Sequence, residues 1–376
     1  MNFLIAPNAL KGSLSAIDAA AVIARALRDV LPDANCRICP IADGGDGTLD
    51  CLVQAAGGEI FSSRVHGPVD SMEVNARWGL LGDTTTAVVE MAEAAGLRLL
   101  RPSEYDVMRA TTAGVGELIA AAAKKGAAKI LLGLGGSATN DGGMGCVRAL
   151  GVKFFNRDGC EIPEGGGNLS RIERFEFKRE EIRDKKIKII ALSDVTNVLC
   201  GPEGAAFTFA AQKGATSEQI RELDGGLKHY ASIIERDLRR QVSEIPGSGA
   251  AGGLGAGLIA FCDATIESGI DFVLDLIGFD KLLAECDCVI TAEGMIDSQT
   301  HKGKGIEGIA RRARKFNKPV QAFVGKIGGD ADLLRREIGL QALWEIAPAG
   351  VSERDSINNA GRFLSRKTRE VYSRKK

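Results

Sequence analysis

The sequence predicts an α/β protein with two domains, one of which is a doubly wound, Rossmann-like parallel sheet formed from both ends of the chain. The chain has 376 residues, enough for about two domains of ~150 residues each. Near both termini, strand-like runs alternate with amphipathic helical runs, which is typical of parallel sheets with right-handed crossovers. The middle of the chain interrupts this alternation. We therefore expect 1–65 and 285–376 to form the first domain and 66–284 an inserted α/β domain, with 112–150 assignable to either.

The first elements follow one another closely along the chain. We expect strands at 3–7 and 36–42, helices at 13–32 and 48–56, and strands without helices between 59 and 82. Ser15 and Asp18 form a capping box at the start of the first helix, and Pro32 marks its end. The turn between the second strand and the second helix is the glycine-rich run from Asp43 to Gly47.

The remaining elements restore the alternation towards the C-terminus. Helices are expected at 111–126, 144–151, 279–286 and 305–316, and strands at 129–136, 186–194, 288–294, 320–326 and 342–348. The stretch from 195 to about 245 is mainly helical in pattern. The last basic run, "RKTREVYSRKK", is expected to be a solvated helix end.

Charge and cysteine usage narrow the class of partner. Lys and Arg number 48 against 49 acidic residues, so the chain has no field that would attract nucleic acid or an acidic membrane surface. We therefore expect a small-molecule partner. The nine cysteines are interpreted as core or incidental thiols, including the pairs Cys36 with Cys39 and Cys286 with Cys288. No secretory signal or spanning segment is apparent, so we expect a cytoplasmic protein; its oligomeric state stays open, a homodimer included.

Five expected strands are each followed by an acid, a hydroxyl or a lysine, in four of the five stretches together with glycines. These stretches are "NALKGS" from Asn8, "DGGDGT" from Asp43, "SATNDGG" from Ser137, "SDVTN" from Ser193 and "MIDSQTHKGKG" from Met295. A single such loop would be an ordinary turn. Five at the carboxyl ends of strands indicate a shared ligand site, because open parallel sheets bind ligands at that edge.

The residue types in these loops favour phosphoryl transfer. Glycine loops expose backbone N–H groups that can hold phosphate oxygens, lysines offset phosphate charge, and carboxylates can hold Mg²⁺ or accept a proton from a hydroxyl. The sequence has only three histidines, and none lies beside a G-x-S-x-G nucleophile elbow. The P-loop pattern G-x-x-x-x-G-K-[ST] is also missing, so a kinase here belongs to another class.

The stretch "LGLGGSATNDGGMG" from Leu132 also fits a second interpretation. Gly133, Gly135 and Ala138 match a loose dinucleotide fingerprint, and Asp158 follows at the spacing of a ribose-binding acid. The alternative function is therefore an NAD-dependent oxidoreductase acting on a small hydroxy acid. We expect residues 140–143 in the first turn of the next helix, where Asp141 would repel a pyrophosphate.

Two further stretches could belong to the site. The run "GSGAAGGLGAG" at 247–257 continues into an apolar helix, so we expect a glycine loop that opens a buried helix rather than a linker. In the segment 198–215, the sequence leaves two alternatives open for Gln212, Lys213 and Gly214: they face the site, or they are an ordinary helix end with a solvated lysine.

The sequence resembles the bacterial type-I glycerate kinases. The resemblance covers nearly the whole chain, through "IAPNALKGSLSA", "PIADGGDGT", "VEMAEAAGL", "LGLGGSATNDGGMG", "SDVTNVLCGPEGA", "GAAGGLGAGL" and "VITAEGMIDSQTHKGKG". It implies ATP-dependent phosphorylation of D-glycerate with Mg²⁺ by a two-domain α/β protein with the cleft between its domains. The expected product is 2-phosphoglycerate, with 3-phosphoglycerate as the alternative.

The resemblance and the loops together predict a role for each residue. For the ATP phosphates or the substrate we expect contacts from two glycine loops and Lys304, the residues of the loops being Gly135, Gly136, Ser137, Thr139, Asn140, Asp141, Gly252 and Gly253. Among these, Asp141 is expected to face a metal ion or a substrate hydroxyl rather than a phosphate. Lys11 or a backbone nest would hold the glycerate carboxylate, and Asp43 or Asp46 would help to bind Mg²⁺. Asp194 or Asp297 would orient the attacking hydroxyl and take its proton.

The sequence departs from the family pattern in loops expected at the site. Asn8-Ala9-Leu10 stands where the family usually has Asp-Ser-Phe, and Val198 stands where it usually has Pro. Ala292 and Met295 replace the Gly and Arg that are frequent in the last motif. These differences affect the choice of substrate more than the type of reaction, so a related hydroxy acid is a second candidate substrate.

Overall fold

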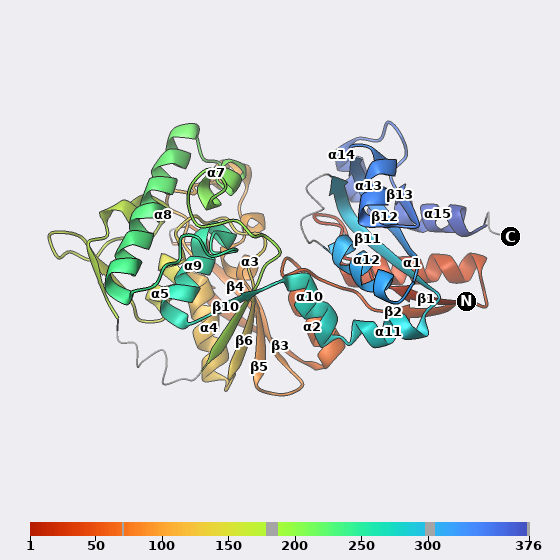
Figure 1. Cartoon of the computed structure of the whole chain (residues 1–376), viewed down its shortest axis with the longest axis horizontal. Coiled ribbons are helices and arrows are strands. Elements are labelled where there is room, and N and C mark those ends of the chain that lie inside the picture. Colours follow the sequence, from red (N-terminus) through yellow and green to blue (C-terminus); the bar gives the residue numbers. More distant parts are fainter. Residues whose placement is uncertain (70, 178–186, 298–304, 374–376) are drawn as a thin grey trace. The chain divides into compact units, whose positions relative to one another are not determined.

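The chain folds into two compact α/β units (Figure 1). The structure is a computed structural model that describes residues 1–69, 71–177, 187–297 and 305–373. Unit 1 consists of Met1–Asp43, Asp50–Ala55 and Ser268–Lys376, and unit 2 of Gly44–Leu49 and Ala56–Glu267. Helix α2 (Thr48–Ala56) carries residues of both units.

Unit 1 is built on a parallel sheet with the strand order β13-β12-β11-β1-β2. The strands are β1 (Asn2–Ile5), β2 (Asn35–Ile38), β11 (Cys288–Asp297), β12 (Val320–Gly328) and β13 (Ala342–Glu345). Chain order reverses between β1 and β11, which makes this pair the topological switch point of the sheet. The two ends of the chain therefore share one sheet, as the alternation of strands and helices predicts.

Helices cover both faces of this sheet. Phe3 and Ile5 pack in a core with α1 (Ala16–Val30) and α15 (Ala360–Ser373), whereas Leu4 points the opposite way into a second core. The second core contains α10 (Gly269–Leu276), α11 (Phe279–Glu285), α12 (Gly305–Lys315) and α13 (Ala331–Ile338). A short helix, α14 (Glu353–Asn358), precedes α15. The predicted doubly wound α/β architecture is confirmed for this unit.

Unit 2 contains a mixed sheet with the order β10-β9-β6-β5-β4-β3. Its strands are β3 (Gly58–His66), β4 (Glu73–Leu81), β5 (Thr86–Glu90), β6 (Lys129–Gly133), β9 (Lys188–Leu192) and β10 (Thr265–Glu267). The strands β5, β6, β9 and β10 are parallel to one another. The strands β3 and β4, which are among those expected between 59 and 82, are antiparallel. A separate hairpin pairs β7 (Lys153–Phe155) with β8 (Arg174–Glu176).

The helices of unit 2 surround one large core. They are α3 (Met91–Ala95), α4 (Ala113–Lys124), α5 (Met144–Ala149), α7 (Ala205–Phe209), α8 (Ser217–Leu238) and α9 (Ala250–Cys262). The sequence assigned no strand to β5, because its run is continuously apolar and passes directly into α3. The limits of the two units also differ from the expected 1–65 and 285–376: β3 pairs with β4 in unit 2, and 268–284 belongs to unit 1.

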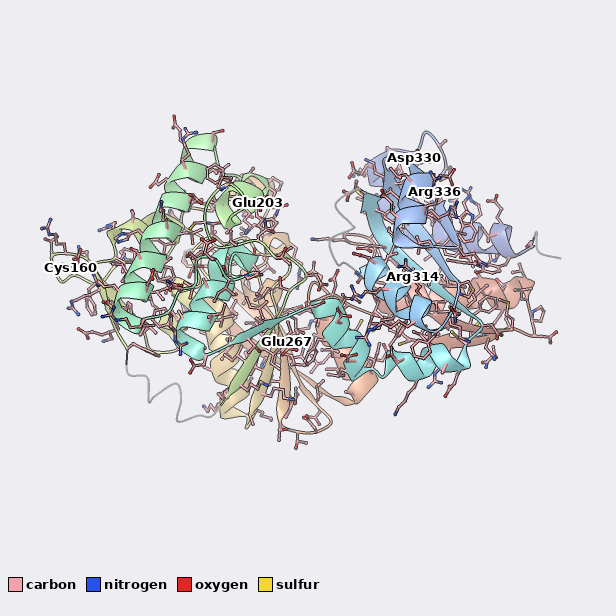
Figure 2. All side chains as sticks on the ribbon, in the orientation of Figure 1. Cys160, Glu203, Glu267, Arg314, Asp330 and Arg336 are labelled. Carbon is pink, nitrogen blue, oxygen red and sulfur yellow. The ribbon has the colours of Figure 1, made fainter. Side chains whose placement is uncertain are left out.

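The nine cysteines are free thiols. Cys39, Cys286 and Cys288 are buried and Cys36 is half-buried, as expected for packing residues, while Cys160 is exposed on the loop between β7 and β8 (Figure 2). Among the residues that the structure describes, no group of three His, Cys, Asp or Glu side chains could hold a metal ion. None of the described helices is long and apolar enough to cross a membrane.

Candidate active site

Three strand ends of unit 2 lie at the same level. Glu90 at the end of β5 is opposite Gly133 of β6, and Gly133 is opposite Leu192 of β9. The segments 91–98, 134–143 and 193–198 therefore leave the sheet side by side at its carboxyl edge, where α/β proteins bind ligands. These segments include most of the residues that the sequence predicts for the phosphates.

The loop from 134 to 143 is attached by backbone hydrogen bonds to the segment 91–98 and to the glycine turn that follows Asp43. The Gly135 N–H donates to the Gly44 carbonyl at 3.1 Å, and the Ala138 N–H donates to the Ala95 carbonyl at 2.9 Å. Because the Gly135 N–H is used in this way, the backbone donor predicted for a phosphate is better placed at Gly136.

Asp141 holds this loop from the inside. It is fully buried, and its carboxylate accepts hydrogen bonds from the Thr112 N–H at 2.9 Å, the Thr112 hydroxyl at 2.8 Å, the Gly143 N–H at 3.0 Å and the Gly145 N–H at 3.1 Å. Burial raises the pKa of Asp141, and these donors oppose that rise. The carboxylate joins the loop to the starts of α4 and α5, which is a different role from the expected contact with a metal ion or a substrate hydroxyl.

The expectation of a helical turn at 140–143 is wrong. Helix α5 begins only at Met144, and Gly142 and Gly143 have φ values of +62° and +78°, which L side chains rarely adopt. The dinucleotide fingerprint requires its glycines to open a helix directly after the strand. Here ten residues, 134–143, separate β6 from α5, so the structure does not support the NAD-binding interpretation.

The glycine run at 247–257 opens a buried helix, as predicted. Ala251, Gly252 and Gly253 at the start of α9 are successive left-handed residues. The Gly252 carbonyl accepts from the Gly142 N–H at 3.0 Å, and a Cβ on Gly252 would lie 2.0 Å from the Thr139 carbonyl oxygen. Only glycine fits at this position, because the start of α9 lies directly against the loop 134–143.

Asn140 and Lys213 are the two unusual polar residues of this region. Both side-chain polar atoms of Asn140 are buried and have no hydrogen-bond partner within the described part of the chain. Lys213 is 2% exposed, and its ammonium donates to the Ser137 hydroxyl at 2.8 Å and the Thr139 carbonyl at 2.7 Å. The sequence left Lys213 open between the site and a solvated helix end, and the structure buries it against the loop.

A network of carboxylates and arginines follows β5. Arg98 contacts Asp46 at 3.2 Å and Glu93 at 2.8 Å, and Arg77 contacts Glu93 at 3.0 Å. Glu90 is 2% exposed, and its carboxylate accepts from the Leu49 N–H at 2.7 Å. Sequence reasoning singled out none of the acids of "VEMAEAAGL", although an acid at the end of an apolar strand is the pattern that found Asp194.

Burial raises the pKa of Glu90 to about 7, the Leu49 N–H opposes the rise, and the charges of Glu93 and Asp46 add to it. For Glu93, burial also raises the pKa, but the hydrogen bonds and charge of Arg77 together with the charge of Arg98 outweigh it and lower the pKa overall. Two acids three residues apart therefore have pKa values shifted in opposite directions.

Asp194 lies where the sequence predicts it, two residues after β9, and is half-buried. The preceding residue, Ser193, donates its N–H to the Glu267 carbonyl at the end of β10 at 3.0 Å. The position of Asp194 at the carboxyl edge is thus set by the pairing of β9 with β10.

Unit 1 brings its own predicted residues to the switch point of its sheet. The Asn8 N–H donates to the Ala292 carbonyl at 2.9 Å, and the Asn8 side chain donates to the Asp43 carboxylate at 3.2 Å. Lys11 is exposed on the same loop, and Asp297 is half-buried at the end of β11. Asn8, a departure from the family pattern, therefore orients Asp43.

The predicted residues divide between the two units. Lys11, Asp43 and Asp297 belong to unit 1, and the predicted residues from Asp46 to Gly253 belong to unit 2. Asp43 and Asp46, which were expected to help to bind the same metal ion, are therefore residues of different units. Lys304 lies outside the described residues.

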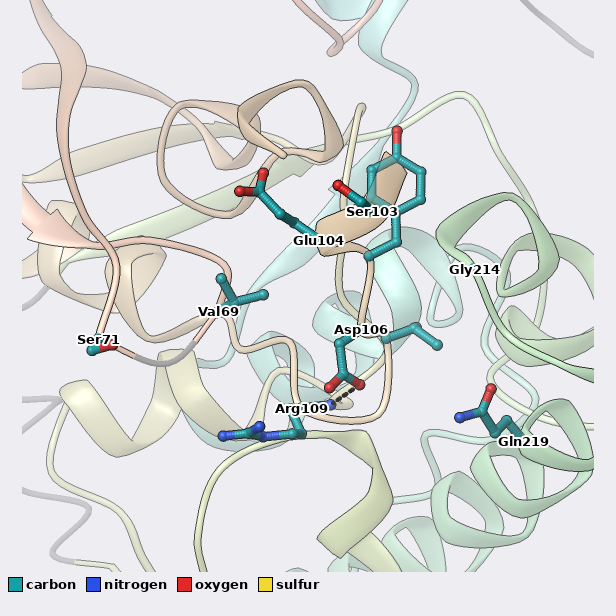
Figure 3. Close-up of a pocket in the computed structure, with 10 residues that line it drawn as sticks. Val69, Ser71, Ser103, Glu104, Asp106, Arg109, Gly214 and Gln219 are labelled. Atoms are coloured by element: carbon teal, nitrogen blue, oxygen red, sulfur yellow. Dashed lines mark hydrogen bonds between the residues drawn. The ribbon is translucent and has the colours of Figure 1, made fainter. Parts of the chain in front are cut away.

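A pocket of about 660 Å³ lies elsewhere in unit 2 (Figure 3). Its lining includes Val69, Glu104, Arg109 and Gln219, together with Asp106, which accepts from the Arg109 N–H at 3.3 Å. Of the residues that the sequence considers for the site, Gly214 lines this pocket; the described residues predicted for ATP, glycerate and Mg²⁺ do not.

Comparisons with known proteins cover the whole chain. A family model described as the glycerate kinase family matches residues 3–375. A glycerate kinase of Bacillus subtilis is 40% identical over 371 residues, which cover 99% of this chain and 97% of the relative. A glycerate 2-kinase of Escherichia coli is 42% identical over 346 residues, 92% of this chain and 90% of the relative. The crystal structure of a putative glycerate kinase 2 from Salmonella typhimurium matches with a TM-score of 0.83 at 40% identity and covers 99% of this chain and 97% of that one.

Proposed function

Because this chain belongs to the glycerate kinase family, we propose that it transfers the γ-phosphoryl group of ATP to D-glycerate and forms 2-phosphoglycerate. The observation that carries the proposal is the family match over residues 3–375. The name of the glycerate 2-kinase relative favours the hydroxyl at C2 as the acceptor. Membership of this family makes the chain a kinase with a small-molecule substrate and ATP as its co-substrate.

The ATP phosphates bind at the carboxyl edge of the unit 2 sheet. The support for this placement is the buried side chain of Asn140, which has no partner within the described residues. A buried amide without partners is costly unless a ligand or water satisfies it. Asn140 lies between Thr139, whose carbonyl is held by Lys213, and Asp141, which holds the loop from the inside. We place phosphate contacts at Gly136, Ser137, Thr139 and Asn140. The segment at Gly252 and Gly253 packs against this loop and supports it.

Mg²⁺ fits this site as a cation shared with ATP. The described residues contain no dedicated cluster of three metal-binding side chains, and Mg²⁺ on nucleotides usually uses one or two carboxylates together with phosphate oxygens. Asp46 or Asp43 would supply such an oxygen, although Asp46 also contacts Arg98 at 3.2 Å. When bound, Mg²⁺ neutralises phosphate charge.

In the reaction, the C2 hydroxyl oxygen of glycerate attacks the γ-phosphorus, the bond to ADP breaks, and the hydroxyl proton passes to a carboxylate. Asp194 of unit 2 and Asp297 of unit 1 are the two proposed bases. Lys11 binds the substrate carboxylate, since it is an exposed cation at the switch point of unit 1. Lys304 is proposed as a second cation for the phosphates.

The test measures ADP release with D-glycerate and with other small hydroxy acids. Enolase added to the products distinguishes the two phosphoglycerates, because it consumes 2-phosphoglycerate and not 3-phosphoglycerate. Nicotinamide absorbance without ADP release would instead indicate a dehydrogenase. Asp194→Asn and Asp297→Asn, made singly, identify the base, and Asp158→Asn on an exposed loop is the control. If both site variants kept the wild-type kcat, neither aspartate would be the base.

We also propose that the protein works in the cytoplasm. ATP is available there, and the nine free cysteines would remain reduced.

A further inference from the structure

Lys213 has a side chain that is almost fully buried, which is rare for a lysine. It ends a short 3-10 helix (Ala211–Lys213), and it is 2% exposed, whereas lysines are rarely buried fully unless they are paired. Its two hydrogen-bond partners are the Ser137 hydroxyl at 2.8 Å and the Thr139 carbonyl at 2.7 Å. Both acceptors are neutral, so neither offsets the charge of the ammonium.

We infer that Lys213 is a positioning residue of the ATP phosphate site: its ammonium fixes the segment Ser137–Asn140 in the conformation that receives the phosphates. This inference rests on the proposed function. The contacts to Ser137 and Thr139 hold both sides of Ala138, and the next residue along the chain is Asn140 with its unsatisfied buried amide.

The rest of the loop is fixed independently of Lys213. Asp141 is bonded to the starts of α4 and α5, and the Thr139 hydroxyl faces the Ala251 carbonyl at 3.5 Å. Loss of the ammonium therefore frees the segment 137–140 without releasing the whole loop. The expected consequence is weaker binding of ATP rather than unfolding of unit 2.

The charge on Lys213 couples this role to pH. A buried cation with neutral partners is costly, and an anionic ligand nearby reduces the cost. Burial lowers the pKa of Lys213 to about 7, and the charge of Asp141 acts in the opposite direction. The phosphates of ATP should therefore bind best to the protonated lysine and should draw a proton onto it when the pH is above 7.

The other titratable groups around Asp141 do not change charge in this range. Tyr230 on α8 and Cys146 on α5 both interact with Asp141, and burial raises the pKa of each well above its ordinary value. Both groups stay neutral near pH 7, so among the described titratable groups it is Asp141 whose charge acts on Lys213.

The test compares wild type with Lys213→Met, Lys213→Arg and the control Lys228→Met, an exposed lysine on α8. We expect the KM for ATP in Lys213→Met to rise roughly tenfold at pH 7, with a smaller change in kcat. In wild type, the KM for ATP should rise by up to about tenfold per pH unit above the lysine pKa. Lys213→Arg, which is always protonated, should restore a low KM and abolish this rise. The ionisation of ATP itself contributes equally to all four proteins.

Calorimetry of ATP binding in two buffers of different ionisation enthalpy gives a readout besides activity. Above pH 7, wild type and Lys228→Met should take up a fraction of a proton more on binding ATP than Lys213→Met does. An unchanged KM and pH profile in Lys213→Met, or a fall in kcat alone, would overturn the inference. If Lys213→Met does not fold, Lys213→Arg decides the question. A KM for ATP that still rises with pH in Lys213→Arg would overturn the inference, and a KM that does not change with pH would support it. Wild type that binds ATP but releases no ADP with any hydroxy acid would instead refute the proposed function.

Discussion

Glu90 provides a sharp test of how burial sets charge in unit 2. The side chain is 2% exposed, and one carboxylate oxygen accepts from the Leu49 N–H at 2.7 Å. Glu90→Gln keeps an oxygen for this hydrogen bond and has nearly the same shape, but it cannot ionise. The substitution therefore isolates the free energy of placing a negative charge at this position.

The size of the effect follows from the pKa of Glu90, which is raised from 4.5 to about 7, chiefly by burial. A carboxyl whose folded pKa is raised contributes stability that is fully present below 4.5 and is lost as the pH rises through 7. The shift is about 2.5 units, and each unit is worth about 1.36 kcal/mol, so the loss is about 3 kcal/mol. Glu90→Gln should thus be more stable than wild type by about 3 kcal/mol at pH 8 and nearly equal to it at about pH 4.

The assay is urea unfolding followed by the fluorescence of Trp78. The chain has 2 tryptophans, and Trp344 belongs to unit 1, so a Trp344→Phe background leaves Trp78 as the reporter of unit 2. Trp78 lies on β4 opposite Val89, the residue before Glu90. A variant that is equally or less stable than wild type at pH 8, or a difference that does not change with pH, would refute the reasoning.

Glu93→Gln is the matched comparison. Glu93 is 7% exposed, but Arg77 and Arg98 hold its pKa below the ordinary value despite its burial. Its ionised form contributes stability above the unfolded pKa, and that contribution is lost as the pH falls through the lowered value. Glu93→Gln should therefore be less stable than wild type at pH 8, and the same sign for both variants would contradict the electrostatic explanation.

The other predictions concern the loop 134–143 and its neighbours. Asp141→Asn places an amide N–H against a buried N–H that now donates to the carboxylate, such as that of Gly143. The variant should destabilise unit 2 by about 1–3 kcal/mol in the Trp78 assay. Stability equal to wild type would argue against an internal role for the carboxylate. Gly252→Ala introduces a Cβ 2.0 Å from the Thr139 carbonyl at a φ of +66° and should raise the KM for ATP and cost at least about 1 kcal/mol of stability. Gly225→Ala on α8, where a Cβ would meet nothing within 4 Å, should stabilise by about 0.5–1 kcal/mol and leave that KM unchanged; equal effects of the two alanines would show that the close approach is unimportant.

Local patterns predict much of the fold because they depend on nearby residues. The alternation of strands and helices at both termini predicts the doubly wound sheet, and the alternating residues after Glu59 predict the strands without helices that the structure shows as β3 and β4. The hydrophobic pattern fails to assign an element where its period and the length of the run fit both a strand and a helix. The apolar run of β5 passes directly into α3, so the sequence predicts no strand there, and the helical turn predicted at 140–143 is a loop.

The candidate site divides in the same way. The sequence by itself determined which loops follow which strands, because strand ends and glycine runs are visible in a short window. Asp194, Asn140 and the glycines at 252 and 253 are predicted as site residues on that basis. Only the tertiary structure decided that the Asp141 carboxylate is hydrogen-bonded to the protein's own backbone and that Lys213 is buried against Ser137. The physical reason is that the charge and the role of an ionisable group depend on its desolvation and on partners far along the chain, as Ser137 is 76 residues from Lys213; both are set only when the chain has folded.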